Sequence, residues 1–252
     1  MKSWLIAASL CSVVLAAPSS AQTEKPAPVR SAAGMTAEKV LARFVEVTGG
    51  VEAYKKITTT VTRGTVELKA QGIKGTMETT SKAPNLFRSS QNIAGIGEML
   101  QGYDGKVAWS KDPINGLREL EGVEKALALR ASAFNAPIRW RELYKKAALT
   151  GSKKIGDADA WVVVLTPAVG KPVVQYYDKK TGLMVRMDIV AEGPQGTIPT
   201  ETLISDYREV DGVKTPFRAV TKLGSAIEME LVTTEVKNNV PVEDSIFAKP
   251  AK

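Results

Sequence analysis

Residues 202–224, TLISDYREVDGVKTPFRAVTKLG, decide the fold of this chain. Two apolar-rich runs flank Asp211–Gly212, a dipeptide favoured in two-residue hairpin turns because both central residues of the turn need a positive φ. Residues typical of strands, such as Thr, Val, Ile and Phe, are common in both runs. The stretch therefore predicts a β-hairpin within an antiparallel sheet.

The neighbouring stretches repeat this pattern. Residues 173–190, VVQYYDKKTGLMVRMDIV, predict a hairpin with Thr181–Gly182 in its turn. Residues 226–236, AIEMELVTTEV, predict a strand that follows a turn at Gly224–Ser225. Upstream, residues 57–110 contain about five strand-like runs separated by turn residues. We predict a meander of about ten or eleven antiparallel strands, which must curve because open sheets of this size twist and curl.

A helix is predicted before the first strand, over residues 37–48. Thr36 is a suitable N-cap, and Gly49–Gly50 ends the pattern. The apolar residues recur at i, i+3 and i+4, so they lie on one helix face. This face consists of Val40, Leu41, Phe44 and Val45.

Two further helices are predicted in mid-chain. Residues 120–134 are rich in Ala, Leu, Glu and Lys, and residues 138–147 follow Pro137, a residue favoured in a first helical turn. The second helix carries an apolar stripe made of Trp140, Leu143, Tyr144 and Ala147. We predict an α+β fold, an open or half β-barrel whose concave face is covered by the N-terminal helix and this helical pair. Such an arrangement encloses an apolar cavity.

Residues 1–21 have the features of a secretory signal peptide, namely a charged start, an apolar core and a small-residue cleavage site ending at Ala21. The apolar core is shorter than the roughly 20 residues that a membrane-spanning helix needs. We predict cleavage after Ala21 and export to the periplasm. The Pro- and Ala-rich residues 22–34 predict a flexible leader, and residues 35–252 a single domain.

The residue types present limit the chemistry. The chain contains no histidine, and its one cysteine, Cys11, lies in the predicted signal peptide. A hydrolase would have to use carboxylates or a Ser–Lys pair, and the acidic pair Asp157 and Asp159 fits a solvated turn. The net charge of +7 is scattered, without the basic blocks or aromatic interleaving of nucleic-acid binders. We predict no enzyme activity, no cofactor, no metal and no nucleic-acid partner.

Several segments resemble the outer-membrane lipoprotein-sorting family, exported bacterial proteins that include a periplasmic lipoprotein carrier and its outer-membrane receptor. The segments are GGVEAYKKI (49–57), GYDGKVAWSKDP (102–113), FNAPIRWRELY (134–144), YYDKKTGLMVR (176–186) and DYREVDGVKTPF (206–217). The resemblance covers nearly all of the predicted mature chain. It implies an incomplete β-barrel closed by helices, with a cavity for the acyl chains of lipoproteins or related lipids. By location, Arg63 is nearest to the carrier's functional arginine. Unlike the lipid-anchored receptor, this chain has no cysteine after its predicted signal peptide.

The methionines in predicted strands have two interpretations: they fill gaps in a core, or they line a cavity that adapts to varied apolar ligands. Strand alternation predicts three shared faces: Leu183, Val185, Met187 and Ile189; Val213, Phe217 and Ala219; and Ile227, Met229 and Leu231. The candidate cavity and lid residues are Met77, Met99, Trp140, Leu143, Tyr144, Leu183, Val185, Met187, Leu203, Phe217 and Met229.

Four arginines are candidates for the mouth of the cavity. Arg130, Arg139 and Arg141 lie around the predicted helical pair, and Arg63 lies on the first strand. They would either bind an anionic or polar head group or lie solvated on the surface.

Two functions follow from this sequence. The first is an exported, monomeric carrier that sequesters an acyl chain, a lipoprotein or another apolar ligand between the curved sheet and the lid helices. It would exchange this ligand with a membrane-associated donor or receptor. The alternative is a non-catalytic structural or interaction domain of the cell envelope, whose core is filled by its own side chains. An accessible apolar cavity would distinguish the two.

Overall fold

A computed structural model describes residues 34–193, 196–224 and 227–251. The predicted signal peptide, its cleavage site and residues 22–33 of the predicted leader lie outside the described residues, as does Ser225 of a predicted turn. None of the helices in the described part is long and apolar enough to cross a membrane.

Thirteen strands form a single antiparallel sheet. They are β1 (Thr59–Leu68), β2 (Ile73–Lys82), β3 (Leu86–Ile93), β4 (Gly97–Tyr103), β5 (Ala108–Asp112), β6 (Gly116–Glu119), β7 (Lys146–Ile155), β8 (Ala158–Thr166), β9 (Val173–Asp178), β10 (Met184–Gly193), β11 (Gly196–Val210), β12 (Val213–Leu223) and β13 (Ile227–Asn238). The sheet is larger than the predicted one of about ten or eleven strands. The strand β6 was missed because four residues are too few to show alternation.

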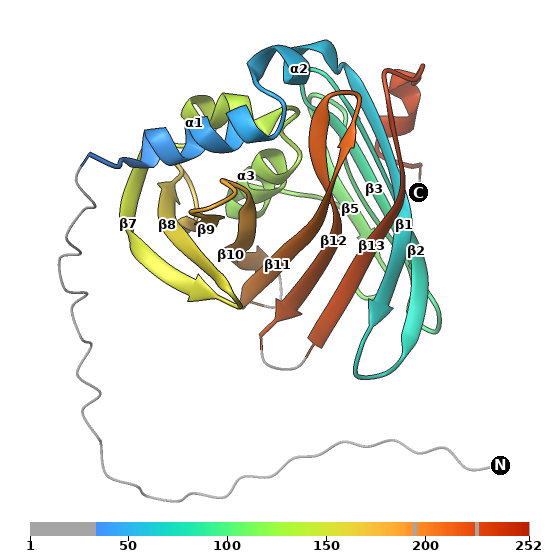
Figure 1. The fold of residues 1–252 in the computed structure, drawn as a ribbon. Coiled ribbons are helices and arrows are strands. Elements are labelled where there is room, and N and C mark those ends of the chain that lie inside the picture. Colours follow the sequence, from blue (N-terminus) through green and yellow to red (C-terminus); the bar gives the residue numbers. More distant parts are fainter. Residues whose placement is uncertain (1–33, 194–195, 225–226, 252) are drawn as a thin grey trace, which may run out of the picture.

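The sheet is open, with β6 and β7 at its two edges and β1 beside β13 in its middle. It curves around the N-terminal and mid-chain helices, which lie on its concave side (Figure 1). The chain passes from one edge to the other between β6 and β7, so the mid-chain helices lie across the opening. The predicted α+β half-barrel is confirmed.

The hairpin turn predicted at Asp211–Gly212 is present. Both residues have a positive φ, 50° and 80°, as a two-residue turn of the predicted type requires. This turn joins β11 to β12, the strand pair encoded by the stretch that decides the fold.

The helix α1 (Ala37–Val47) begins as predicted, with the Thr36 hydroxyl accepting a hydrogen bond from the backbone N–H of Lys39 at 3.3 Å. A short helix, α2 (Val51–Lys56), follows. The apolar face of α1 packs on β8 and β9, where the rings of Phe44 and Tyr177 meet edge to face at 5.3 Å. The α1 core cluster consists of Ala37, Val40, Leu41, Phe44, Val163, Leu165, Val173 and Tyr177.

The first mid-chain helix is confirmed as α3 (Gly122–Ala131), but the second predicted helix, 138–147, is wrong in its extent. A 3₁₀ turn, η1 (Ala136–Arg139), leads into the single turn α4 (Trp140–Leu143). Tyr144 is already extended, and Ala147 pairs with Leu165 across β7 and β8. Pairing with the sheet therefore overrides the local helical preference of these residues.

The predicted alternation along β10 is interrupted. The register between β10 and β9 shifts by one residue between Met184 and Arg186, which leaves Val185 as the extra residue of a bulge. Met184, Met187 and Ile189 all pack against the α1 core cluster. The predicted shared face of Leu183, Val185, Met187 and Ile189 is therefore wrong in assuming unbroken alternation.

Candidate ligand-binding face

Cross-strand pairing arranges the concave face into rows of side chains. One row crosses six strands and holds two of the predicted methionines. This methionine row consists of Met187, Thr202, Thr221, Met229, Leu68 and Ile73. Because Met187 packs against the α1 core cluster and paired residues share a face, the whole row lies on the concave side.

The rows on either side are also largely apolar. One consists of Ile189, Thr200, Leu223 and Ile227, and the other of Ile204, Ala219, Leu231, Val66, Gly75 and Ile93. The concave face thus presents a largely apolar surface across the middle of the sheet, interrupted on β11 and β12 by Thr200, Thr202 and Thr221. The helix α3 lies over this face with none of its residues fully buried.

A pocket of about 590 Å³ lies at the end of this face farther from α1 and α2. It is formed by the turns after β3 and β5 and by the facing ends of β10 and β11. Three isoleucines on its wall are exposed: Ile96 at 41%, Ile114 at 79% and Ile198 at 41%. Met99, a predicted cavity residue, also lines this pocket. We call it the apolar pocket because apolar residues and glycines make up most of its wall, with Asp112, Asn115 and Glu192 as the polar members.

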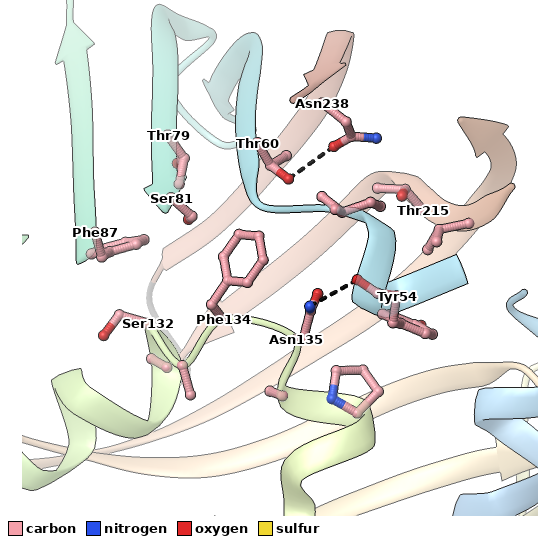
Figure 2. Close-up of a pocket in the computed structure, with 16 residues that line it drawn as sticks. Tyr54, Thr60, Thr79, Ser81, Phe87, Ser132, Phe134, Asn135, Thr215 and Asn238 are labelled. Carbon is pink, nitrogen blue, oxygen red and sulfur yellow. Dashed lines mark hydrogen bonds between the residues drawn. The ribbon is translucent and has the colours of Figure 1, made fainter. Parts of the chain in front are cut away.

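A second pocket, of about 340 Å³, lies at the opposite end of the strands, and Figure 2 shows it in close-up. Its walls are α2, the connection from α3 to η1 and the concave side of β1, β2, β3, β12 and β13. None of its 16 lining residues carries a charge. The ring of Phe134 points into its middle (Figure 2). We call it the polar pocket because hydroxyl and amide side chains surround that ring.

Hydrogen bonds hold the walls of the polar pocket. The Thr60 hydroxyl donates to Asn238 Oδ1 at 2.8 Å, which ties β1 to β13. The Asn135 Nδ2 donates to the Tyr54 carbonyl at 2.9 Å, which ties the α3–η1 connection to α2 (Figure 2). Asn135 has a φ of 55°, a left-handed conformation that asparagine tolerates better than most residues.

The predicted lid residues contact the sheet. Trp140, Leu143 and Tyr144 line a small pocket of about 150 Å³ together with Phe44 and Met184. Trp140 and Tyr144 also pack against the α1 core cluster. Burial raises the pKa of Tyr144, because a charged phenolate would lose its hydration there.

Met77 and Phe217 lie on the concave side, whereas Leu203 does not. Met77 faces Gly64, where an added Cβ would lie 2.7 Å from the Met77 methyl carbon. Phe217 is buried two positions beyond Thr215, a residue of the polar pocket. Leu203 pairs with Arg186, one position away from the methionine row, so it lies on the convex side with an exposure of 42%. Leu183 lies outside β10, in the turn before it.

The predicted arginines do not form one cationic mouth. Arg63 is on the convex face, where its Nε contacts Glu78 at 2.7 Å and its Nη1 contacts Glu235 at 2.8 Å. Its alternation along β1 places it opposite to Gly64 and Met77. Its predicted place at the mouth of the cavity is therefore wrong.

The other three arginines belong to the mid-chain helical segment, and their contacts hold or cover that segment. Arg139 Nη1 donates to the carbonyls of Pro84 and Phe134 and to Asn85 Oδ1, at 2.8–3.2 Å. Arg130 Nη1 donates to the Val169 carbonyl at 2.8 Å, and burial lowers its pKa. The Arg141 guanidinium lies 4.3 Å from the centre of the Trp140 ring.

Sequence reasoning missed the hydroxyl side chains of the polar pocket. Thr60 and Thr62 alternate along β1, and Thr79 and Ser81 alternate along β2, so each pair shares the concave face. The runs TTTVT and ETTS carried this signal. It was overlooked because threonine is also a common strand residue without any role in binding. Within the described residues, no cluster of acidic side chains is arranged to hold a metal ion.

Comparison with known proteins identifies the fold. No protein-family model matches the chain, and no curated protein matches it in sequence. A LolA superfamily protein from Nitrosomonas europaea matches with a TM-score of 0.57 at 15% identity, over 85% of this chain and 98% of that one. A putative outer-membrane lipoprotein-sorting protein domain from Vibrio parahaemolyticus matches with a TM-score of 0.54 at 14% identity, over 84% and 97%. A DUF1329 family protein from Desulfovibrio piger matches with a TM-score of 0.55 at 15% identity, over 84% and 97%. The chain therefore has the fold found in LolA superfamily proteins, as its sequence motifs predicted.

Proposed function

We propose that this protein is an exported, non-enzymatic carrier that holds an acyl chain, a lipoprotein or another apolar ligand on the concave face of its sheet. The observation that carries the proposal is the largely apolar surface from the methionine row to the apolar pocket. The likeness in fold to a lipoprotein-sorting domain supports the same class of ligand.

Burial alone supplies the binding energy in this proposal. Each methylene group moved from water to an apolar surface contributes about 0.8 kcal/mol. A chain that covers the methionine row would therefore bind without any specific polar contact. The thioethers of Met187 and Met229 adjust to ligands of different shape.

The setting we propose is the periplasm, reached after cleavage of the signal peptide behind Ala21. The small-residue cleavage pattern and the fold of a protein described as lipoprotein-sorting both support this setting. The ligand would be exchanged with a membrane-associated donor or receptor, and the carrier would act as a monomer.

A structural or interaction domain is the second candidate. It is favoured by the way that the chain's own side chains occupy much of the α2 end of the concave face, where the Phe134 ring points into the polar pocket (Figure 2). In that case the apolar pocket would be a surface hollow without a ligand.

One isoleucine and one leucine on β11, Ile198 and Leu203, offer a matched test. Ile198 lines the apolar pocket and is 41% exposed, whereas Leu203 lies on the convex face and is 42% exposed. We expect wild-type protein purified from a bacterial periplasm to carry or take up a lipid in native mass spectrometry. Ile198→Glu should lose this lipid, because a buried carboxylate is costly beside an acyl chain. Leu203→Glu should keep it. A wild-type protein that takes up no lipid, or equal uptake by both variants, would contradict the proposal.

A further inference from the structure

The polar pocket differs in chemistry from the rest of the concave face. Eight of its 16 lining residues carry a hydroxyl or a side-chain amide, and none carries a charge. These eight are Tyr54, Thr60, Thr79, Ser81, Ser132, Asn135, Thr215 and Asn238. A pocket with this lining can donate and accept hydrogen bonds but cannot neutralise an ion.

Two hydroxyls in this pocket are available to a ligand. Those of Ser81 and Thr215 make no hydrogen bond to any other described residue, and neither is sealed away from the pocket space. The Thr60 hydroxyl donates to Asn238, which leaves its oxygen able to accept a further bond. The pocket therefore presents both donors and acceptors that the protein itself does not satisfy.

The concave face changes from polar to apolar along the strands. On β2, Ser81 and Thr79 lie at the end near α2, and Ile73 lies at the far end on the same side. On β3, Phe87 lines the polar pocket, and the turn that follows the strand places Ile96 in the apolar pocket. β3 ends at Ile93, six residues after Phe87, which is roughly 20 Å at about 3.3 Å per residue, and the turn that holds Ile96 lies beyond that end. Only a long amphiphile could reach both pockets.

We propose that the polar pocket binds the neutral polar group of a lipid, a hydroxyl, ester or amide, while the acyl chain extends over the methionine row toward the apolar pocket. This inference rests on the proposed carrier function and gives the ligand a direction and a chemical class. An ionised carboxylate or phosphate would lose its hydration in the pocket and meet no cation among the lining residues. The pocket thus selects against ionised head groups.

The test compares two probes with the same acyl chain, 1-monooleoylglycerol and oleate, at a mildly alkaline pH. We expect the wild-type protein to bind the neutral probe about ten-fold more tightly or better, as measured by calorimetry. The double variant Ser81→Ala/Thr215→Val should bind monooleoylglycerol about ten-fold more weakly, since each lost hydrogen bond costs a few-fold in affinity. Its affinity for oleate should stay unchanged.

The matched control is Thr76→Val, which removes a hydroxyl from the convex side of the same strand as Ser81. It should bind both probes as the wild-type protein does. Equal binding of both probes by the wild-type protein, or an unchanged preference in the double variant, would overturn this inference while the carrier function stands. If the wild-type protein binds neither probe, the carrier function itself fails, and this inference fails with it.

Discussion

At the scale of single residues, one buried contact, between Trp109 and Phe247, holds the C-terminal segment against the convex face of the sheet. The Trp109 side chain is fully buried and donates from its Nε1 to the Phe247 carbonyl at 2.9 Å. Phe247 belongs to the C-terminal 3₁₀ turn η2 (Asp244–Phe247), and its side chain is fully buried too. The indole fits only because its neighbour in β4 is Gly102, where an added Cβ would lie 2.4 Å from the ring.

Replacing Gly102 tests this contact. Gly102→Ala should lower the free energy of unfolding by about 1–3 kcal/mol, because a buried ring backed by Phe247 has little room to move. Gly193→Ala is the control, since its added Cβ would meet only the Glu124 carboxylate at an ordinary 3.7 Å. Urea denaturation measures both. Equal stability of the two variants would show that the Trp109 ring moves aside without lowering the free energy of unfolding, which would contradict this account of the contact.

Tyr176 links stability to alkaline pH. Burial, followed by the hydrogen bond that its hydroxyl donates to Asp188 at 2.8 Å, raises the pKa of Tyr176 to about 12. The folded state keeps this proton between about pH 10 and 12, whereas the unfolded state loses it. The contribution of Tyr176 to the free energy of unfolding is therefore fully present below about pH 10 and is lost as the pH rises toward 12. Tyr176→Phe should make this fall less steep by about 1.4 kcal/mol per pH unit. An identical slope in both proteins, from urea denaturation across this range, would contradict the assignment.

At the scale of elements, the mid-chain segment from α3 to α4 (122–143) crosses the opening of the sheet and is held there by contacts with the strands and turns on either side. We call this segment the strap. Its helical turns are short, and its attachment depends on Arg139, which donates to the β2–β3 turn at Pro84 and Asn85. The sequence predicted helices here from composition and apolar spacing. It did not predict where the second helix ends, because β7 takes up residues from 146 onward by pairing with β8.

Arg139→Met should loosen this strap. Hydrogen exchange of the backbone amides in residues 132–143 should become at least several-fold faster, while β8 and β9 keep their protection. Arg141→Met is the matched control, because Arg141 is exposed and its guanidinium stacks on Trp140 of the same segment at 4.3 Å. Equal exchange in the two variants would mean that the strap is held by packing alone.

At the scale of the whole molecule, hairpin chemistry was enough to predict a curved antiparallel sheet, because turns such as Asp211–Gly212 fix the pairing of consecutive strands. The pairing of β1 with β13 joins distant parts of the chain, and no local pattern reports it. The alternation of side chains along the strands is enough to predict the concave position of Met77, Met187 and Met229. The placement of Leu203 and Arg63 on the convex face depends on register, which only the assembled sheet reveals.

The central claim is that an acyl chain lies on the concave face, and photo-crosslinking maps this directly. The protein would be irradiated with a monopalmitoylglycerol that carries a diazirine in its acyl chain, and the adducts located by peptide mass spectrometry. Adducts on Met187, Met229 or Leu68, in the methionine row, are the predicted result. Adducts confined to the convex face, at Leu203 or its partner Val220, or no adduct at all, would contradict the account.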